Sequence, residues 1–159
     1  MNNSLRLEQM VSEITKKGNV RATLQRRTSS NVFAEDKFIY SYGHHYILGT
    51  LIGSTWLVNT ERYSTSTGRH LSYLRSALSK NGVTSDKIIY TPIDTSTLEP
   101  AAIIRNGIRL LETASMEVAR QLEKTRKGSG NNLRLIRELQ EIEQSQRRLV
   151  VLGEMRGGQ

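Results

Sequence analysis

The stretch HYILGTLIGSTWLVNTERY, residues 45–63, decides the fold. Strand-forming residues fill 45–51 and recur over 55–61, and Gly53-Ser54 lies between these two runs. Two strand-like runs joined by a short glycine-containing turn are typical of a β-hairpin. The stretch therefore predicts paired strands over 45–51 and 55–61, around which the neighbouring segments are expected to pack.

Two further elements are predicted near the N-terminus. Residues 4–17 carry apolar side chains at the spacing of one helix face, and Ser4 suits the N-cap position, so this segment predicts a short helix. NVRATLQRR, residues 19–27, alternates apolar and polar side chains. This alternation predicts a half-buried strand with a cationic outer side.

The segments on either side of the hairpin complete this part of the chain. KFIYSYG, residues 37–43, predicts a strand. One face of that strand would carry Phe38, Tyr40 and Tyr42. Leucines at helical spacing predict a helix over 68–80, and KIIYTPID, residues 87–94, predicts a further strand. Residues 1–98 are therefore expected to form an α+β domain, with helices packed on a small antiparallel sheet.

The last part of the chain, residues 99–159, has a different pattern. Pro100 suits the first turn of a helix, and apolar residues recur at steps of three and four on both sides of the loop KGSGNN, residues 127–132. Two such helices joined by a short polar loop predict an antiparallel helical hairpin. Each helix has a narrow apolar seam, so residues 99–150 are expected to form a homo-oligomer or to dock on a host or phage protein.

The chain is basic, with a net charge of +8. The largest excess of basic over acidic side chains lies in residues 1–30, which have six basic and two acidic side chains. A basic surface favours nucleic acid as a partner because lysine and arginine release the counterions condensed on phosphates. A charge that serves only solubility is the alternative. The cations expected to contact nucleic acid in this segment are Lys16, Lys17, Arg21, Arg26 and Arg27.

NTERYSTSTGRH, residues 59–70, is rich in hydroxyl side chains and leads into a predicted helix. One interpretation is that a hydroxyl, such as that of Thr67, only caps the helix. The other is that the helix start and the adjacent guanidinium groups bind an anion such as phosphate. The residues expected to form this anion site are Arg62, Ser64, Ser66, Thr67, Arg69 and His70.

Aromatic residues recur between positions 40 and 73. As core residues or cross-strand pairs they would be buried. As a surface beside the arginines they would stack on the bases of single-stranded nucleic acid. The residues concerned are Tyr40, Tyr42, Tyr46, Trp56, Tyr63 and Tyr73.

Several classes of function are not expected. The chain has no cysteine, which suits a reducing cytoplasm, and shows no signal peptide or membrane-spanning run. A metal site formed by His44 or His45 with His70 and Asp36 has no specific spacing, so no metal or cofactor is expected. No hydrolase or nucleotide-binding motif occurs, so the protein is not expected to be an enzyme. The alternative, an enzyme that acts on phosphoesters or nucleotides, would use His70, Arg69 and Tyr63.

A further pattern lies in residues 39–71. It consists of a YSY run, an N…YS strand end and a turn similar to T-T-x-x-H, here at Tyr40-Ser41-Tyr42, Asn59, Tyr63-Ser64, Ser66-Thr67 and His70. This order and spacing resemble a small domain found in many bacteriophage genomes. Ser66 stands where that family usually has threonine and keeps the hydroxyl. The resemblance covers about a fifth of the chain. It implies a phage origin and a setting in the host bacterial cytoplasm, and it implies no activity.

These patterns lead to two hypotheses of function. The first is a small basic phage-type protein that binds nucleic acid through its cationic N-terminal region and the hydroxyl- and arginine-rich helix start. The alternative is a protein-interaction module, such as a host-factor inhibitor or an anti-defence protein, that acts through the C-terminal helical hairpin. The fold class by itself does not decide between them.

Overall fold

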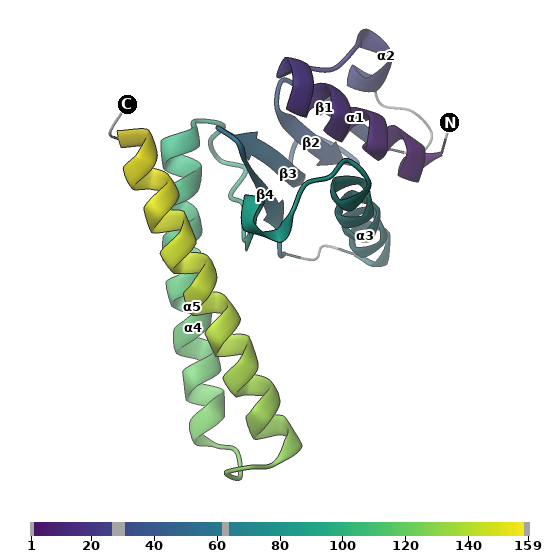
Figure 1. Ribbon diagram of the computed structural model, residues 1–159. Helices are drawn as coiled ribbons and strands as arrows, with labels where there is room; N and C mark the ends of the chain where they lie inside the picture. The colour runs from purple at the N-terminus through teal and green to yellow at the C-terminus, as the bar shows by residue number, and fades with distance from the viewer. Residues whose placement is uncertain (1, 27–30, 62–63, 158–159) are drawn as a thin grey trace. The chain divides into compact units, whose positions relative to one another are not determined.

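The computed structural model describes residues 2–26, 31–61 and 64–157 (Figure 1). Contacts divide the chain into a first unit that ends at Thr95 and a second unit that begins at Ser96. The first unit contains a five-stranded sheet with packed helices, and the second contains two helices packed on each other. The predicted α+β class with a C-terminal helical hairpin is therefore confirmed.

The sheet has the strand order β1-β2-β3-β4-β5. The first four strands are antiparallel neighbours, and β5 pairs in parallel with β4. A parallel neighbour requires a crossover connection, which α3 (Thr65–Lys80) and the short 3-10 helix η1 (Ser85–Lys87) supply. The strands are β1 (Val32–Glu35), β2 (Phe38–Ser41), β3 (Ile47–Ile52), β4 (Thr55–Asn59) and β5 (Ile88–Thr91).

The hairpin predicted from residues 45–63 is formed by β3 and β4. Ile52 pairs with Thr55 at its closed end, and Gly53 in the turn has a φ of 62°. A positive φ at this position favours glycine because a side chain would crowd the backbone there. The glycine therefore fixes where the two strands turn.

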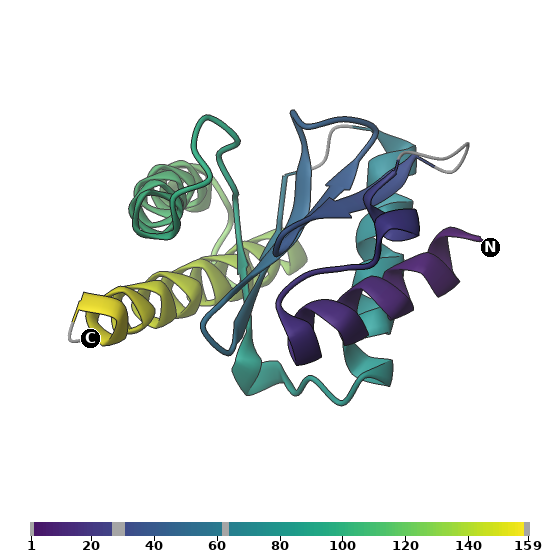
Figure 2. The same ribbon diagram turned by 90° about the horizontal axis from the view of Figure 1, so that it is seen from above.

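Two helices, α1 (Asn3–Lys17) and α3, lie on the same face of the sheet and pack on each other (Figure 2). Leu7 and Ile14 of α1, Leu74 of α3 and Trp56 of β4 are buried in the core that they form with the sheet. Burial of each such side chain stabilises the fold by roughly 1.5–3 kcal/mol. This packing also holds the beginnings of the two helices close together.

The strand predicted over residues 19–27 is wrong. The structure has one helical turn there, α2 (Ala22–Gln25). Val20 and Leu24 are buried, whereas Ala22 between them is exposed. The two buried apolar residues are thus four positions apart, which fits a helical turn rather than a strand. The Gln25 side chain donates to the carbonyl of Val20 at 2.8 Å and closes this turn.

Both helix starts differ from the prediction. Asn2, rather than Ser4, caps α1, because its side chain accepts a hydrogen bond from the backbone N–H of Leu5 at 2.8 Å. Ser64, rather than Thr67, caps α3, and its hydroxyl accepts from the N–H of Thr67 at 3.2 Å. Each cap satisfies one of the N–H groups that have no acceptor within the helix.

The second unit is the predicted hairpin of α4 (Pro100–Glu123) and α5 (Gly130–Gly157). The Glu99 carboxylate caps α4 by accepting from the N–H groups of Ala101 and Ala102. The seam between the helices is made by a few buried apolar side chains, among them Ile104, Leu111, Leu135 and Leu149. In the part of the chain that the structure describes, no helix is long and apolar enough to cross a membrane.

Candidate nucleic-acid interface

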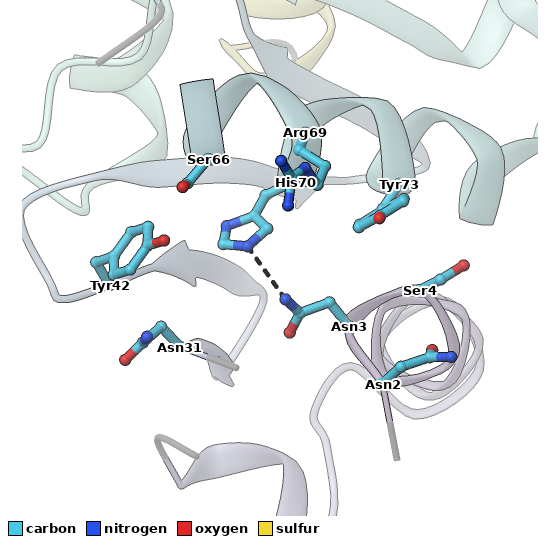
Figure 3. A pocket seen from close by; sticks show the side chains of 9 residues that line it. All are labelled: Asn2, Asn3, Ser4, Asn31, Tyr42, Ser66, Arg69, His70 and Tyr73. Carbon is cyan, nitrogen blue, oxygen red and sulfur yellow. Dashed lines mark hydrogen bonds between the residues drawn. The ribbon is translucent and has the colours of Figure 1, made fainter. Parts of the chain in front are cut away.

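A polar cavity of about 350 Å³ lies where the N-termini of α1 and α3 meet (Figure 3). None of the described residues that line it is acidic. Figure 3 shows the ring of His70 between Tyr42 on one side and Asn3 on the other. The lining residues are Asn2, Asn3 and Ser4 of the α1 start, Asn31 and Tyr42 beside β1 and β2, and Ser66, Arg69, His70 and Tyr73 of α3.

The position of the cavity gives it a positive potential. The first N–H groups of a helix have no acceptor within it, and the helix dipole adds a partial positive charge at this end. Asn2 and Ser64 each satisfy one such N–H group, at Leu5 and Thr67 respectively. Arg69 adds a full charge, and its side chain is exposed at the wall of the cavity. This potential favours negatively charged oxygen atoms.

His70 forms a neutral wall of the cavity. The residue is only 4% exposed. Asn3 Nδ2 lies 3.1 Å from His70 Nε2 and donates to it, so the ring carries its proton on Nδ1 and donates to Ser41 Oγ at 2.7 Å. Burial, and to a lesser extent the charge of Arg69, lowers the pKa of His70. His70 therefore holds Asn3 and Ser41 in place as an uncharged ring and adds no cation for phosphate.

The amide of Asn3 has one unsatisfied atom. Its Nδ2 is bonded to His70, whereas its Oδ1 is buried and has no hydrogen-bond partner. A buried polar atom that makes no hydrogen bond costs about 1–3 kcal/mol. Since this oxygen has almost no accessible surface, a molecule in the cavity would reach it only if the Asn3 side chain moved.

Two residues at the edge of the cavity have an unusual backbone conformation. Asn31 has a φ of 64° and Tyr42 a φ of 70°, and the N–H of Tyr42 donates to the carbonyl of Asn31 at 2.8 Å. A non-glycine residue with such a φ is uncommon and is often found where the surrounding structure holds a functional geometry. Here the result is that the ring centroid of Tyr42 lies 5.5 Å from that of His70.

The prediction that Tyr42 shares a strand face with Phe38 and Tyr40 is therefore wrong. β2 ends at Ser41, and Tyr42 follows it with a positive φ. The rings of Phe38 and Tyr40 lie 6.5 Å apart, whereas that of Tyr42 contacts His70 of α3. The turn moves Tyr42 to the side of the sheet that α1 and α3 cover.

The hydroxyl residues of the predicted anion site have separate roles. Ser64 and Thr67 form the cap of α3, with their hydroxyl oxygens 3.1 Å apart, and Thr67 is only 2% exposed. Ser66 lines the cavity together with Arg69 and His70. The capping interpretation therefore holds for Ser64 and Thr67, whereas anion binding by this segment stays a prediction. Arg62 and Tyr63 lie outside the described residues.

The predicted N-terminal cations that the structure describes do not line the cavity. Lys16 and Lys17 are exposed in the last turn of α1, about 20 Å from the helix start at a rise of about 1.5 Å per residue. Arg21 donates through Nε to Glu13 at 2.7 Å, so part of its charge is already compensated. Arg26 is exposed. Arg27 lies outside the described residues.

Arg6 is a structural residue that the sequence analysis did not single out. It is 5% exposed, and its guanidinium group donates to the carbonyl of Val32 at 3.2 and 3.0 Å and to that of Arg26 at 3.1 Å. Among the described residues it forms no ion pair with a carboxylate. Arg6 thus joins α1 to both ends of the segment that leads to Asn31. In the sequence, Arg6 precedes Met10 by one helical turn and adjoins the apolar stripe of α1. This position is the feature of the sequence that indicates its burial.

Several residues of the phage-like pattern hold the fold together. Asn59 donates to the carbonyl of Ile47 at 2.7 Å, and its Oδ1 accepts from the N–H groups of Glu61 at 3.0 Å and Ile93 at 3.3 Å. Asn59 therefore connects β3 with the segments that follow β4 and β5. Ser41 anchors His70 in the same way across β2 and α3.

Most of the aromatic residues belong to the core. Tyr40, Tyr46 and Trp56 are buried, so these three do not offer a stacking surface. Tyr42 and Tyr73 line the cavity, and Tyr42 is 37% exposed. His44 is bonded to Glu35 at 2.8 Å, and the described part of the chain has no group of three residues placed to hold a metal ion.

Compared with protein-family models, with curated proteins and with solved structures, the chain shows no significant match. The interpretation of the cavity therefore depends on its own geometry and chemistry.

Proposed function

We propose that the protein binds nucleic acid, and that the cavity at the starts of α1 and α3 is part of the binding surface. The observation that carries this proposal is the convergence of two helix N-termini on a cavity whose described lining contains Arg69 and no acidic residue. Sugar-phosphate backbones are contacted by this combination of arginine, amide and hydroxyl groups with helix N-termini. The net charge of +8 supports the same partner, because it strengthens long-range attraction to phosphates.

The proposal is tested by fluorescence anisotropy with a labelled DNA strand at several salt concentrations. We expect measurable affinity at low salt that falls steeply as the salt concentration rises. The substitution Arg69→Gln removes the charge at the cavity wall, and we expect affinity to fall roughly tenfold, as for loss of a charged hydrogen bond. Arg75→Gln is the matched control, since Arg75 is exposed on the same helix and does not line this cavity.

Two outcomes would contradict the proposal. One is the absence of binding at low salt. The other is an equal loss of affinity in the Arg69 and Arg75 variants, which would indicate only a nonspecific charge effect.

A second proposal is a protein-interaction function of the helical hairpin. The observation that favours it is a set of large apolar side chains that α5 exposes, including Leu133, Val151 and Met155, which are 55%, 52% and 62% exposed. Exposed apolar side chains that adjoin one another, as Val151 and Met155 do one helical turn apart, are typical of contact surfaces, whereas single ones are not. We infer that this surface mediates self-association, or docking on a host or phage protein in the manner of an inhibitor or anti-defence factor.

Light scattering coupled to size-exclusion chromatography tests self-association. We expect an oligomer in the native protein and a shift towards monomer in the double variant Val151→Ser, Met155→Ser. Gln144→Ser, also on α5, is the control. A native protein that is monomeric at high concentration would contradict the proposal that this surface mediates self-association.

A further inference from the structure

We propose that the cavity between α1 and α3 takes one unpaired nucleobase, so that the protein binds single strands in preference to duplexes. This inference deepens the proposed function and rests on it. In this proposal a planar, neutral group occupies the cavity. The surrounding cations contact the phosphates that flank that group.

The interior of the cavity suits a neutral ligand better than a phosphate. The buried ring of His70 in its lining is engaged at both nitrogens by Asn3 and Ser41. Because burial lowers the pKa of this ring, it stays uncharged at neutral pH. The charge in the lining is that of Arg69, which is exposed rather than buried. A fully charged phosphate deep in the cavity would lack a buried cation as partner.

The hydrogen-bonding groups of the cavity match the edge of a base. Bases present alternating donors and acceptors on one edge, and amide side chains pair with such edges. Asn2 and Asn3 bring amide side chains to the lining of the cavity. Ser4 and Ser66 add hydroxyl groups, which can donate or accept, at the same cavity.

The cavity also has an aromatic wall. Tyr42 is 37% exposed, and its positive φ holds the ring beside that of His70. Unstacked bases in single-stranded nucleic acid commonly stack on tyrosine or histidine rings. The volume of about 350 Å³ lies at the lower end of the range for small-ligand sites. It therefore admits one nucleotide unit rather than a helix.

A base inside a duplex reaches such a cavity only after unpairing and unstacking, which costs a few kcal/mol. A single strand has no base pair to break, so the free-energy cost of placing its base in the cavity is smaller. Arg69, Ser4 and Ser66 line the cavity and offer charged and hydroxyl groups that can hold the phosphates next to the base. The preference for a single strand follows from this combination.

The test uses the full-length native protein and three fluorescent DNA probes of equal length. These are an oligothymidylate of about 12 nucleotides, the same sugar-phosphate chain without bases, and a duplex. The first two have the same backbone charge and differ only in the bases. We expect the chain without bases and the duplex each to bind about tenfold more weakly than oligothymidylate, within the range for loss of base stacking.

Variants of Tyr42 test whether the bases contribute to affinity at this cavity. Tyr42→Ala should abolish most of the difference between the chain with bases and the chain without them, whereas Tyr42→Phe keeps the ring and should keep the difference. If Tyr42→Ala fails to fold, as circular dichroism would reveal, the comparison of probes on the native protein and on Tyr42→Phe still decides the question.

The outcomes separate the two proposals. If none of the three probes binds, the proposed function and this inference both fall. If the chain without bases or the duplex binds as tightly as oligothymidylate, nucleic-acid binding stands and the nucleobase assignment is overturned. A tenfold preference that is unchanged in Tyr42→Ala would place the base elsewhere and would also overturn the assignment.

Discussion

Arg6 shows how one buried polar side chain can organise a segment of irregular structure. Its guanidinium group makes its hydrogen bonds with the backbone carbonyls of Val32 and Arg26, so it fixes the two ends of the connection that precedes β1. Burial lowers the pKa of this guanidinium but leaves it charged, as an arginine in a protein is. The loss of such a donor would leave buried carbonyl groups unsatisfied.

We therefore predict that Arg6→Met lowers the free energy of unfolding by about 2–3 kcal/mol, the cost expected for unpaired buried carbonyls. Urea denaturation followed by circular dichroism measures this change. Arg75→Met is the control, because Arg75 is exposed and such surface changes usually stay within about 0.5 kcal/mol. Equal stabilities of the two variants would show that Arg6 does not have the structural role that its contacts indicate.

His70 makes stability dependent on pH. Its pKa is lowered in the folded state, first by burial and then by Arg69, whereas in the unfolded chain it titrates near about 6.5. The groups that face its ring from other elements are the Ser41 hydroxyl, the Asn3 amide and the Tyr42 ring. Below about pH 6.5 the unfolded state therefore binds more protons than the folded state, and stability falls as the pH falls.

We predict that lowering the pH from 7.5 to 5.5 destabilises the native protein more than it destabilises His70→Gln. The difference has an upper limit of about 1.4 kcal/mol per pH unit below the unfolded pKa. Urea denaturation of both proteins at the two pH values measures it. Identical pH dependence in the two proteins would mean that His70 titrates in the folded state as it does in the unfolded chain.

At the scale of secondary-structure elements, two glycines have opposite roles. A Cβ atom at Gly49 in β3 would lie 2.9 Å from the carbonyl oxygen of Leu57 and 2.9 Å from Cδ2 of Leu74. Gly49 therefore permits close contact of β3 with β4 and α3. A Cβ atom at Gly68, within α3, would have no neighbouring atom within 4 Å. Gly68 thus has no such packing role.

We expect Gly49→Ala to destabilise the protein by about 1–3 kcal/mol through overpacking. Gly68→Ala should instead stabilise it by about 0.5–1 kcal/mol, because alanine loses less conformational entropy in a helix. Thermal and urea denaturation of the two variants provide the comparison. A stabilising Gly49→Ala would show that the strand and helix can separate there at little cost.

The failed strand prediction at residues 19–27 belongs to the same scale. Alternation of apolar residues over so short a segment is compatible with period two and with a spacing of four. Packing in the folded protein selects the spacing of four, because Val20 and Leu24 are buried and Ala22 is not. Longer elements such as α1, the β3–β4 hairpin and α4 carry enough repeats for the pattern to have one interpretation.

At the scale of the whole molecule, two of the exposed basic regions of the first unit lie apart from each other. One is the cavity with Arg69, and the other is the C-terminal turn of α1 with Lys16 and Lys17. The length of α1 places them about 20 Å apart. A nucleic-acid strand with a phosphate about every 3.4 Å would need about six nucleotides to reach from one surface to the other.

We predict that affinity for single-stranded DNA rises with length up to at least about six nucleotides. In the double variant Lys16→Gln, Lys17→Gln this gain with length should largely disappear, and the slope of log affinity against log salt should decrease by about 1.4, for two lost phosphate contacts. Anisotropy with a series of oligonucleotide lengths measures both effects. A variant that retains the full length dependence would show that the strand leaves the cavity in another direction.

The sequence by itself determined the local elements and the kind of chemistry available. Hydrophobic periodicity and the glycine turn at residue 53 specify the hairpin, the helices and the α+β class, because these signals arise between residues that are near each other in the chain. The same holds for the hydroxyl-rich start of α3, where Ser66, Arg69 and His70 were candidate site residues.

Only the tertiary structure decided which of those residues share a cavity. Asn3 and His70 are 67 positions apart in the sequence, and their contact exists because α1 and α3 pack on the same face of the sheet. The backbone turn at Tyr42 and the buried position of Arg6 are likewise set by contacts with distant segments. No local pattern carries that information, since hydrogen bonding and burial depend on neighbours that folding alone supplies.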